Sequence, residues 1–297
     1  MMKILIITGM TASGKSGLAV KIAKQYNGEI ISADSVQIYR GLNIGSAKDP
    51  IDARQGITHH LIDIRDFDAT YNVGEFVLDC QNAINDIISR GKLPIIVGGT
   101  GLYIKALLEG YLLGGAGANI EFREYYQNLA KENGNLAVWE ELNNRNPDLA
   151  KSVHFNNLKR VIRYLEIDTF GENRENTESI LSDYDVCAVG IVADREKIYE
   201  KINARVDIML NDGLEQEVKE LVSNGATRDC QSMNSIGYKE WFDYFDGVVD
   251  KNTTIDLIKQ HTRNYCKRQL TFMKTIKNLE LMTITDAENK IKEFLND

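Results

Sequence analysis

The sequence has few of the residues that mark unusual classes of protein. Of its 297 residues, only four are cysteine and three are proline. The cysteines are far apart and form no C-x-x-C pair, which excludes a cysteine zinc ribbon and a dense disulfide scaffold. No apolar run approaches the roughly 18 residues of a membrane helix, and the opening run KILIITGM is too short for a secretory signal. We therefore expect a reduced, cytoplasmic protein with no membrane partner.

The net charge of -8 argues against a general nucleic-acid-binding protein. Residues 259–278, KQHTRNYCKRQLTFMKTIKN, are the local exception, because they contain no acidic residue. The basic residues of this run are Lys259, Arg263, Lys267, Arg268, Lys274 and Lys277. The run is either an ordinary basic helix face or a surface that contacts phosphates.

Residues 9–16 read GMTASGKS and match the phosphate-binding pattern G-x-x-x-x-G-K-[ST]. The apolar run KILIIT precedes them and the helical pattern GLAVKIAKQY follows, which is the context that this loop requires. Backbone N–H groups at such a helix start favour an anion. The expected diphosphate or nucleotide contacts are Gly9, Met10, Thr11, Ala12, Ser13, Gly14, Lys15 and Ser16. Lys15 would meet terminal phosphate oxygens, and the Ser16 hydroxyl would ligate Mg²⁺.

Four strand-like runs alternate with amphipathic helical patterns: KILIIT, EIISADS, LPIIVGGTG and VCAVGIV. This alternation predicts an α/β fold with a parallel central sheet and right-handed crossovers. A glycine-rich stretch, GYLLGGAGAN, and a polar helical region interrupt it. We predict a three-layer fold like that of P-loop NTPases, with a discontinuous catalytic core of residues 1–118 and 184–297. Residues 119–183 would form a helical insertion domain.

Asp34 follows the second apolar run, and ligands of parallel sheets bind at the carboxyl ends of strands. It is either a turn or cap residue, or a general base or magnesium partner beside the phosphate loop. The third run, IIVGG, lacks the acidic residue that many nucleotide hydrolases place there, and no Asn-Lys-x-Asp guanine motif is present. Motor, hydrolase and GTPase functions are thereby disfavoured, whereas a small-molecule kinase is not.

Several other polar residues are ambiguous by themselves. His59 and His60 are adjacent, so they point in different directions, and we expect a structural or hydrogen-bonding role for both. Arg160 and Arg163 share a helix face, and Arg205 lies on another predicted helix. Each arginine could contact phosphate or simply be solvated.

The ordered set of motifs resembles the tRNA dimethylallyltransferases. GMTASGKS, ISADSVQIYRGLNIGSAKD, ITHHLIDI, IIVGGTGLYIKALLEG, NNLKRVIRYLEI, INARVDIMLNDGLEQEV, SIGYKEWFDYFDG and TRNYCKRQLTFMK are similar to blocks of that family in the same order. They span nearly the whole chain. The phosphate loop alone is common to many enzymes, but the ordered set is specific. Val36 departs from the family, which often has arginine there.

The resemblance implies transfer of a dimethylallyl group from dimethylallyl diphosphate to N6 of the adenosine 3′-adjacent to a tRNA anticodon. It implies that Asp34 is the base, that Thr11 to Ser16 hold the diphosphate with Mg²⁺ at Ser16, and that Arg205 neutralises the leaving group. The implied catalytic residues are Asp34, Arg205 and Thr11. The expected tRNA contacts, from the resemblance and the basic run, are Asp34, Ser35, Val36, Gln37, Thr100, Arg123, Lys159, Arg160, Val161, Ile162, Arg163, Lys267 and Arg268.

The adenosine must leave the anticodon-loop stack to reach such a pocket. The partners are thus dimethylallyl diphosphate and a tRNA anticodon stem-loop, and we expect a monomer. One alternative is an adenylate prenyltransferase that modifies free AMP, ADP or ATP, which the basic run and the insertion disfavour. Others are a small-molecule P-loop kinase and an RNA-binding protein with a vestigial nucleotide site.

Overall fold

A computed structural model describes residues 1–110, 119–171 and 178–297. The chain divides into two compact units, one of Met1–Gly110 and Glu178–Asp297, the other of Tyr111–Thr177. The predicted insertion, residues 119–183, differs from the second unit at both ends. Residues 178–183 pack with the first unit, where Ser179 Oγ donates to the Leu107 carbonyl and Leu181 is buried. Residues 111–118, which the prediction assigned to the core, lie outside the described residues.

The first unit contains a sheet of six strands, all paired in parallel, in the order β3-β2-β4-β1-β5-β6. The strands are β1 (Lys3–Gly9), β2 (Gly28–Ser32), β3 (His59–His60), β4 (Leu93–Gly98), β5 (Asp185–Ile191) and β6 (Glu280–Met282). The predicted α/β class with a parallel sheet is confirmed. The sequence missed β3 and β6, because runs of two and three residues show no periodicity.

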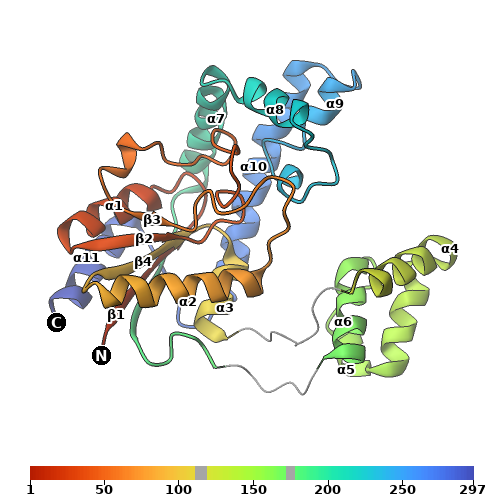
Figure 1. The fold of residues 1–297 in the computed structure, drawn as a ribbon, viewed down its shortest axis with the longest axis horizontal. Helices are drawn as coiled ribbons and strands as arrows, with labels where there is room; N and C mark the ends of the chain where they lie inside the picture. Colours follow the sequence, from red (N-terminus) through yellow and green to blue (C-terminus); the bar gives the residue numbers. More distant parts are fainter. Residues whose placement is uncertain (111–118, 172–177) are drawn as a thin grey trace. The chain divides into compact units, whose positions relative to one another are not determined.

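Helices cover both faces of this sheet (Figure 1). On one face α1 (Lys15–Gln25) and α11 (Ile284–Asn296) pack on alternate strand residues such as Ile7, Val97 and Val189. On the other face α2 (Val73–Ser89) and α3 (Gly101–Glu109) cover the intervening residues. Strands that are buried on both faces read as continuous apolar runs, which is the pattern of β1 and β4.

The rest of the first unit consists of further helices and of the long segment of residues 33–72, which is mainly turns and loops. Its elements are α7 (Arg195–Asn211), α8 (Leu214–Ser223), α9 (Trp241–Phe245) and α10 (Lys251–Met273), with 3-10 turns η1 (Asp52–Arg54) and η2 (Ser232–Asn234). Helices α7 and α10 contact each other, and Ile198, Ile202 and Cys266 form a shared apolar cluster with Met10 of the phosphate loop. This packing places both helices beside that loop.

The second unit is helical, as the sequence predicted for this region. It contains α4 (Ile120–Arg145), α5 (Pro147–Lys151) and α6 (Leu158–Phe170). Its own core includes Val138, Leu142, Val161 and Leu165, all fully buried. Gly134 breaks α4, with a φ of 82° that favours glycine. Throughout the described chain, no helix combines the length and the apolarity needed to cross a membrane.

Candidate active site

The loop between β1 and α1 has the backbone of an anion-binding turn. Ala12 (φ 62°) and Gly14 (φ 89°) are both left-handed, and α1 begins at Lys15. The first N–H groups of a helix have no intrahelical acceptor, so they and the helix dipole favour an anion at this point. The side chains of Met10 and Ser13 are buried. The loop therefore presents mainly its backbone, together with Lys15, to the cavity in front of it.

The ammonium group of Lys15 lies in a buried setting that a bound anion would stabilise. Its Nζ donates to the Met10 carbonyl at 3.4 Å. Burial lowers the pKa of Lys15 to about 8, an effect that Asp34 opposes and Arg205 reinforces. An ammonium group held in such an environment is best stabilised by a nearby negative ligand, because solvent no longer supplies that stabilisation.

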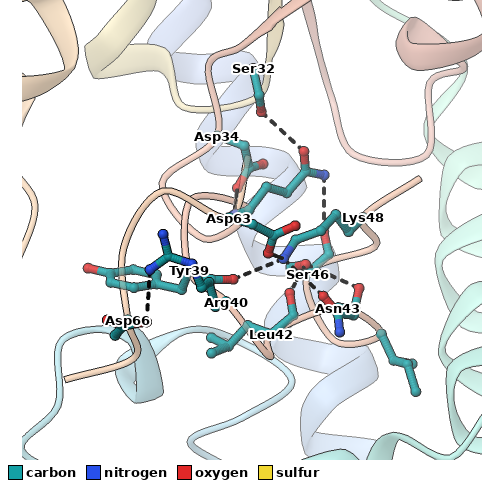
Figure 2. A network of polar contacts seen from close by, with 12 residues as sticks. Ser32, Asp34, Tyr39, Arg40, Leu42, Asn43, Ser46, Lys48, Asp63 and Asp66 are labelled. Carbon is teal, nitrogen blue, oxygen red and sulfur yellow. Dashed lines mark hydrogen bonds and ion pairs between the residues drawn. The ribbon is translucent and has the colours of Figure 1, made fainter. Parts of the chain in front are cut away.

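Asp34 lies just beyond the end of β2, and Figure 2 shows it close to Ser32 of that strand. Its Oδ1 accepts hydrogen bonds from the backbone N–H groups of Val36 (2.9 Å) and Gln37 (3.3 Å). Among the described residues, no hydrogen bond to Oδ2 is recorded. One carboxylate oxygen of Asp34 thus stabilises the turn, and the other makes no such bond. A turn role and a role as base or magnesium partner, the two alternatives from the sequence, are therefore compatible.

A cavity of about 220 Å³ brings the predicted catalytic residues together. It is lined by Thr11, Lys15 and Ser16 from the phosphate loop, by Asp34 from the end of β2, and by Arg205 from α7. Burial lowers the pKa of Arg205, and the carboxylate of Asp49, which lines the same cavity, opposes that shift. Thr11 and Arg205, more than 190 positions apart in the sequence, therefore line the same cavity.

A second cavity of about 340 Å³ shares Thr11, Asp34 and Arg205 with the first. It continues past Tyr265 and Arg268 of α10. Its other lining residues include Ser35, Val36, Gly45, Ser46, Ala47, Ile202, Val206, Met209, Asn234, Ser235, Ile236, Gly237, Lys239, Ile258 and Thr262. A third cavity of about 570 Å³ also reaches Arg205. Arg205 therefore borders all three cavities, and Thr11 and Asp34 border the first two.

Thr100, at the start of α3, joins two strand ends. Its Oγ1 accepts from Ser35 N at 3.0 Å and donates to Ser35 Oγ at 3.3 Å. This contact requires Gly98, because a Cβ there would lie 2.0 Å from the Ala33 carbonyl oxygen. Of the predicted tRNA contacts, Asp34, Ser35 and Thr100 are thus neighbours in space.

Gln269 of α10 is a site residue that the sequence did not reveal. Its side chain is buried, accepts from Thr11 N at 2.8 Å and donates to the Gly99 carbonyl at 2.9 Å. It therefore ties the phosphate loop to the end of β4. The surrounding basic run drew attention to charge, and no spacing rule marks one buried glutamine among exposed lysines and arginines.

The basic residues of α10 are in different states. Lys267 and Arg268 are exposed, and each lies over an aromatic ring, Lys267 over Tyr199 and Arg268 over Tyr265. Lys259, in contrast, forms an ion pair with Asp207. Lys274 and Lys277 are exposed as well, so these two lysines and the exposed pair are available to a polyanion.

The second unit carries the other predicted tRNA contacts. Arg123 and Arg163 both bind the fully buried carboxylate of Glu166, with Nη–Oε distances of 2.7 and 2.5 Å. Burial raises the pKa of Glu166, but these partners and the N–H of Asn119 outweigh burial and lower it overall. Two further predicted residues, Val161 and Ile162, have their side chains in the core of this unit. Lys159 and Arg160, however, are exposed on α6.

The adjacent histidines face different partners. His60 Nε2 lies 2.7 Å from Glu29 Oε2, and the buried Glu29 carboxylate also pairs with Arg90 and Lys92, whose side chains are partly exposed. His59 lines the first cavity, and its Nδ1 lies 2.9 Å from the Ile57 carbonyl oxygen. Burial lowers the pKa of His59.

Oxygen donors suited to Mg²⁺ line the first cavity. They are the Ser16 hydroxyl and the carboxylates of Asp34 and Asp49. Mg²⁺ typically takes one or two protein oxygens together with water and phosphate. Among the described residues, no group of three or more His, Cys, Asp or Glu side chains could hold a metal. The donor set thus fits an ion that a phosphate ligand helps to bind.

Comparison with known proteins gives a consistent result. A family model described as IPP transferase matches residues 37–276. A tRNA dimethylallyltransferase of Bacillus cytotoxicus is 44% identical over 298 residues, covering 99% of this chain and 93% of its own. A tRNA dimethylallyltransferase of Bacillus mycoides is 43% identical, with the same coverage.

Solved structures agree. The tRNA isopentenylpyrophosphate transferase of Bacillus halodurans has a TM-score of 0.75 and 38% identity, covering all of this chain and 97% of its own. A eukaryotic dimethylallyltransferase, described as acting on tRNA, has a TM-score of 0.81 and 29% identity. That likeness covers 96% of this chain and 75% of the eukaryotic one.

Proposed function

The chain belongs to the IPP transferase family of tRNA dimethylallyltransferases, and on that premise we propose the reaction that its site performs. The donor is dimethylallyl diphosphate, and the acceptor is N6 of the adenosine 3′-adjacent to the anticodon of a tRNA. The products are N6-isopentenyladenosine and diphosphate. The observation that carries this proposal is the first cavity, where Lys15 and Ser16 of the phosphate loop lie with Asp34 and Arg205.

The chemistry is a displacement at the allylic carbon. The N6 lone pair forms the new C–N bond while the C–O bond to diphosphate breaks. Asp34, whose Oδ1 is engaged in the turn, takes the N6 proton at its other oxygen. The adenine amine is a weak nucleophile, so both a base and a good leaving group are needed.

The leaving group is stabilised from two sides. Lys15 and the backbone N–H groups of Ala12 and residues 14–16 bind the diphosphate at the start of α1, and Arg205 faces it from α7. The N–H groups of Thr11 and Ser13 already donate within the protein. Negative charge on the diphosphate grows as the C–O bond breaks, so fixed positive groups stabilise the transition state more than the ground state. Ser16 and a neighbouring carboxylate would hold Mg²⁺, which would neutralise further diphosphate charge when bound.

The acceptor enters beside the second cavity. Residues 34–37, Thr100, Lys267 and Arg268 lie around its Asp34 end or on α10, and we propose that they contact the anticodon loop. A base must leave the stack to reach Asp34, as for other base-modifying enzymes. Lys159, Arg160, Arg163 and Arg123 of the second unit would contact the RNA backbone. We propose that the protein acts as a cytoplasmic monomer.

One incubation tests the function. The protein is mixed with Mg²⁺ and radiolabelled dimethylallyl diphosphate, together with an anticodon stem-loop RNA, the same RNA with guanosine at the target position, or AMP. We expect label only in the adenosine-containing RNA. Label in AMP alone would indicate an adenylate prenyltransferase, and phosphate transfer from ATP would indicate a kinase.

A further inference from the structure

A short loop, residues 43–47, forms a wall of all three cavities. Ser46 and Ala47 line both the first and the second cavity, and Gly45 lines the second. Asn43, Ile44 and Ala47 line the third. Any shift of this loop therefore changes the space in which the phosphate loop, Asp34 and Arg205 act.

Glu217 of α8 holds this loop by its backbone. Oε2 accepts from the N–H groups of Asn43 (3.0 Å) and Ile44 (2.8 Å), and Oε1 accepts from Gly45 N at 3.1 Å. Three successive N–H groups that converge on one point form an anion-binding concavity. Here the protein fills that concavity with its own carboxylate, and charge-assisted hydrogen bonds of this kind are stronger than neutral ones.

Tyr238 contacts both Glu217 and the loop, and we call Glu217 and Tyr238 together the clamp. Its fully buried hydroxyl donates to Glu217 Oε1 at 2.7 Å and accepts from Ser46 N at 3.1 Å. The ring packs so closely that a Cβ at Gly45 would lie 2.6 Å from a ring carbon. Burial raises the pKa of Tyr238 well above its ordinary value, and the Glu217 carboxylate reinforces the shift. The phenol therefore stays protonated and keeps donating.

Side-chain contacts of Lys48 and Ser46 also hold the loop (Figure 2). Lys48, buried beside the loop, donates to the Tyr39 carbonyl at 2.9 Å and to Asp63 Oδ1 at 2.6 Å. Ser46 Oγ donates to the Leu42 carbonyl at 2.5 Å. Asp49, the electrostatic partner of Arg205, follows directly in the chain. Because Glu217 lies on α8, the clamp links the position of α8 to the positions of Ser46, Ala47 and Asp49.

We propose that Glu217 is a positioning residue for the prenyl transfer. By holding three N–H groups of residues 43–45, it sets Ser46, Ala47 and Asp49 at the distance from Arg205 that fits the donor diphosphate. This inference rests on the proposed function. Glu217 does not line the first or second cavity, so it acts through the loop and touches no reacting atom.

The test compares two neutralised carboxylates on the same helix. Glu217→Gln replaces one acceptor oxygen by an amide donor that faces backbone donors. Glu220→Gln removes the same charge from an exposed residue whose recorded partner is Gln216. Steady-state rates are measured with dimethylallyl diphosphate and stem-loop RNA, well below the melting temperature of each variant, together with RNA affinity.

We expect Glu217→Gln to lower kcat/KM for the donor by roughly 10- to 100-fold relative to Glu220→Gln, because small misplacements of a site have effects of this size. RNA affinity should be unchanged. A purely structural role would lower the melting temperature but leave the donor kinetics of the folded enzyme intact, and that result would overturn the proposal. If wild-type protein modifies no RNA, the proposed function itself fails, so the two failures are distinguishable.

Tyr238→Phe provides a second, milder probe should Glu217→Gln not fold. It keeps the ring against Gly45 and removes only the hydroxyl that joins Glu217 to Ser46 N. We expect a smaller loss of donor kcat/KM in the same direction, and a double variant less impaired than the product of the two single effects. Wild-type donor kinetics in Tyr238→Phe, or fully multiplicative effects, would contradict the clamp.

Discussion

Asp34 combines two demands that usually compete for one carboxylate. Its Oδ1 stabilises the turn after β2 through two backbone N–H groups, while the side chain also lines the first and second cavities. A base that is fixed by its own turn needs little reorganisation before proton transfer. The sequence suggested either role; under the proposed function the same residue has both.

Asp34→Asn separates the roles, because the amide oxygen can still accept from Val36 N and Gln37 N. We expect kcat to fall by about 10²- to 10⁴-fold, the usual contribution of a general base, with melting temperature and RNA affinity near wild type. Asp34→Ala should lose the turn contacts as well and be less stable. Single-turnover rates and thermal melts measure both effects, and near-normal turnover in Asp34→Asn would exclude the base role.

At the scale of elements, an ion cluster around one buried carboxylate stabilises the edge of the sheet. Glu29 of β2 is 2% exposed and contacts Arg90 at 2.5 Å, Lys92 at 2.7 Å and His60 of β3 at 2.7 Å. Hydrogen bonds from Arg90 are the main reason that the pKa of Glu29 is far below its ordinary value. The very short strand β3 is held in the sheet partly by this side-chain cluster.

Glu29→Gln should lower the free energy of unfolding by about 2 kcal/mol at neutral pH, because the buried position loses its charge-assisted hydrogen bonds. The loss is limited because Arg90 and Lys92 are about a third exposed and stay partly solvated. A carboxyl whose pKa is lowered by folding adds stability above its unfolded pKa and loses it as the pH falls towards the folded pKa. Wild-type protein should therefore lose more stability than Glu29→Gln between about pH 5 and about pH 3. Urea unfolding at several pH values measures this, and Asp86→Asn, at an exposed partner of Arg90, is the control.

The exposed end of α10 belongs to the same scale. Reversing Lys267 and Arg268 to Glu should weaken RNA binding and flatten its dependence on salt by roughly 1.5 to 2 units of the log–log slope, because fewer counterions are released. Lys259→Glu is the matched control, since that lysine is already paired with Asp207. Fluorescence anisotropy with a labelled stem-loop, over a salt series, decides the matter. An unchanged slope would remove this part of α10 from the RNA surface.

At the scale of the whole molecule, the two units have different tasks under the proposed function. The first unit contains the complete cavity for the donor, and the second contributes exposed basic residues on α6. The buried carboxylate of Glu166 fixes the side chains of Arg123 and Arg163 of that unit through ion pairs. The donor site should therefore be insensitive to changes on the surface of the second unit.

Lys159→Glu combined with Arg160→Glu tests this division. We expect the KM for RNA to rise by about tenfold, in line with the loss of two phosphate contacts, while the KM for dimethylallyl diphosphate stays at the wild-type value. Lys151→Glu, an exposed residue of the same unit, controls for charge alone. A change in the KM for the donor, or an unchanged KM for RNA, would contradict the assignment of donor binding to the first unit and RNA contacts to α6 of the second.

The sequence by itself determined the phosphate loop, the parallel α/β core and the family, because these features are written in contiguous residues. An apolar run, a glycine-rich turn and a helix specify their structure locally, and ordered motifs specify a family. Only the tertiary structure decided which distant residues share the cavity. The family resemblance implied Arg205, but it did not indicate Gln269 or Glu217. These two residues reach the first 50 residues of the chain through hydrogen bonds across more than 170 positions. Such contacts depend on three-dimensional closure, and no period or spacing in the sequence records them.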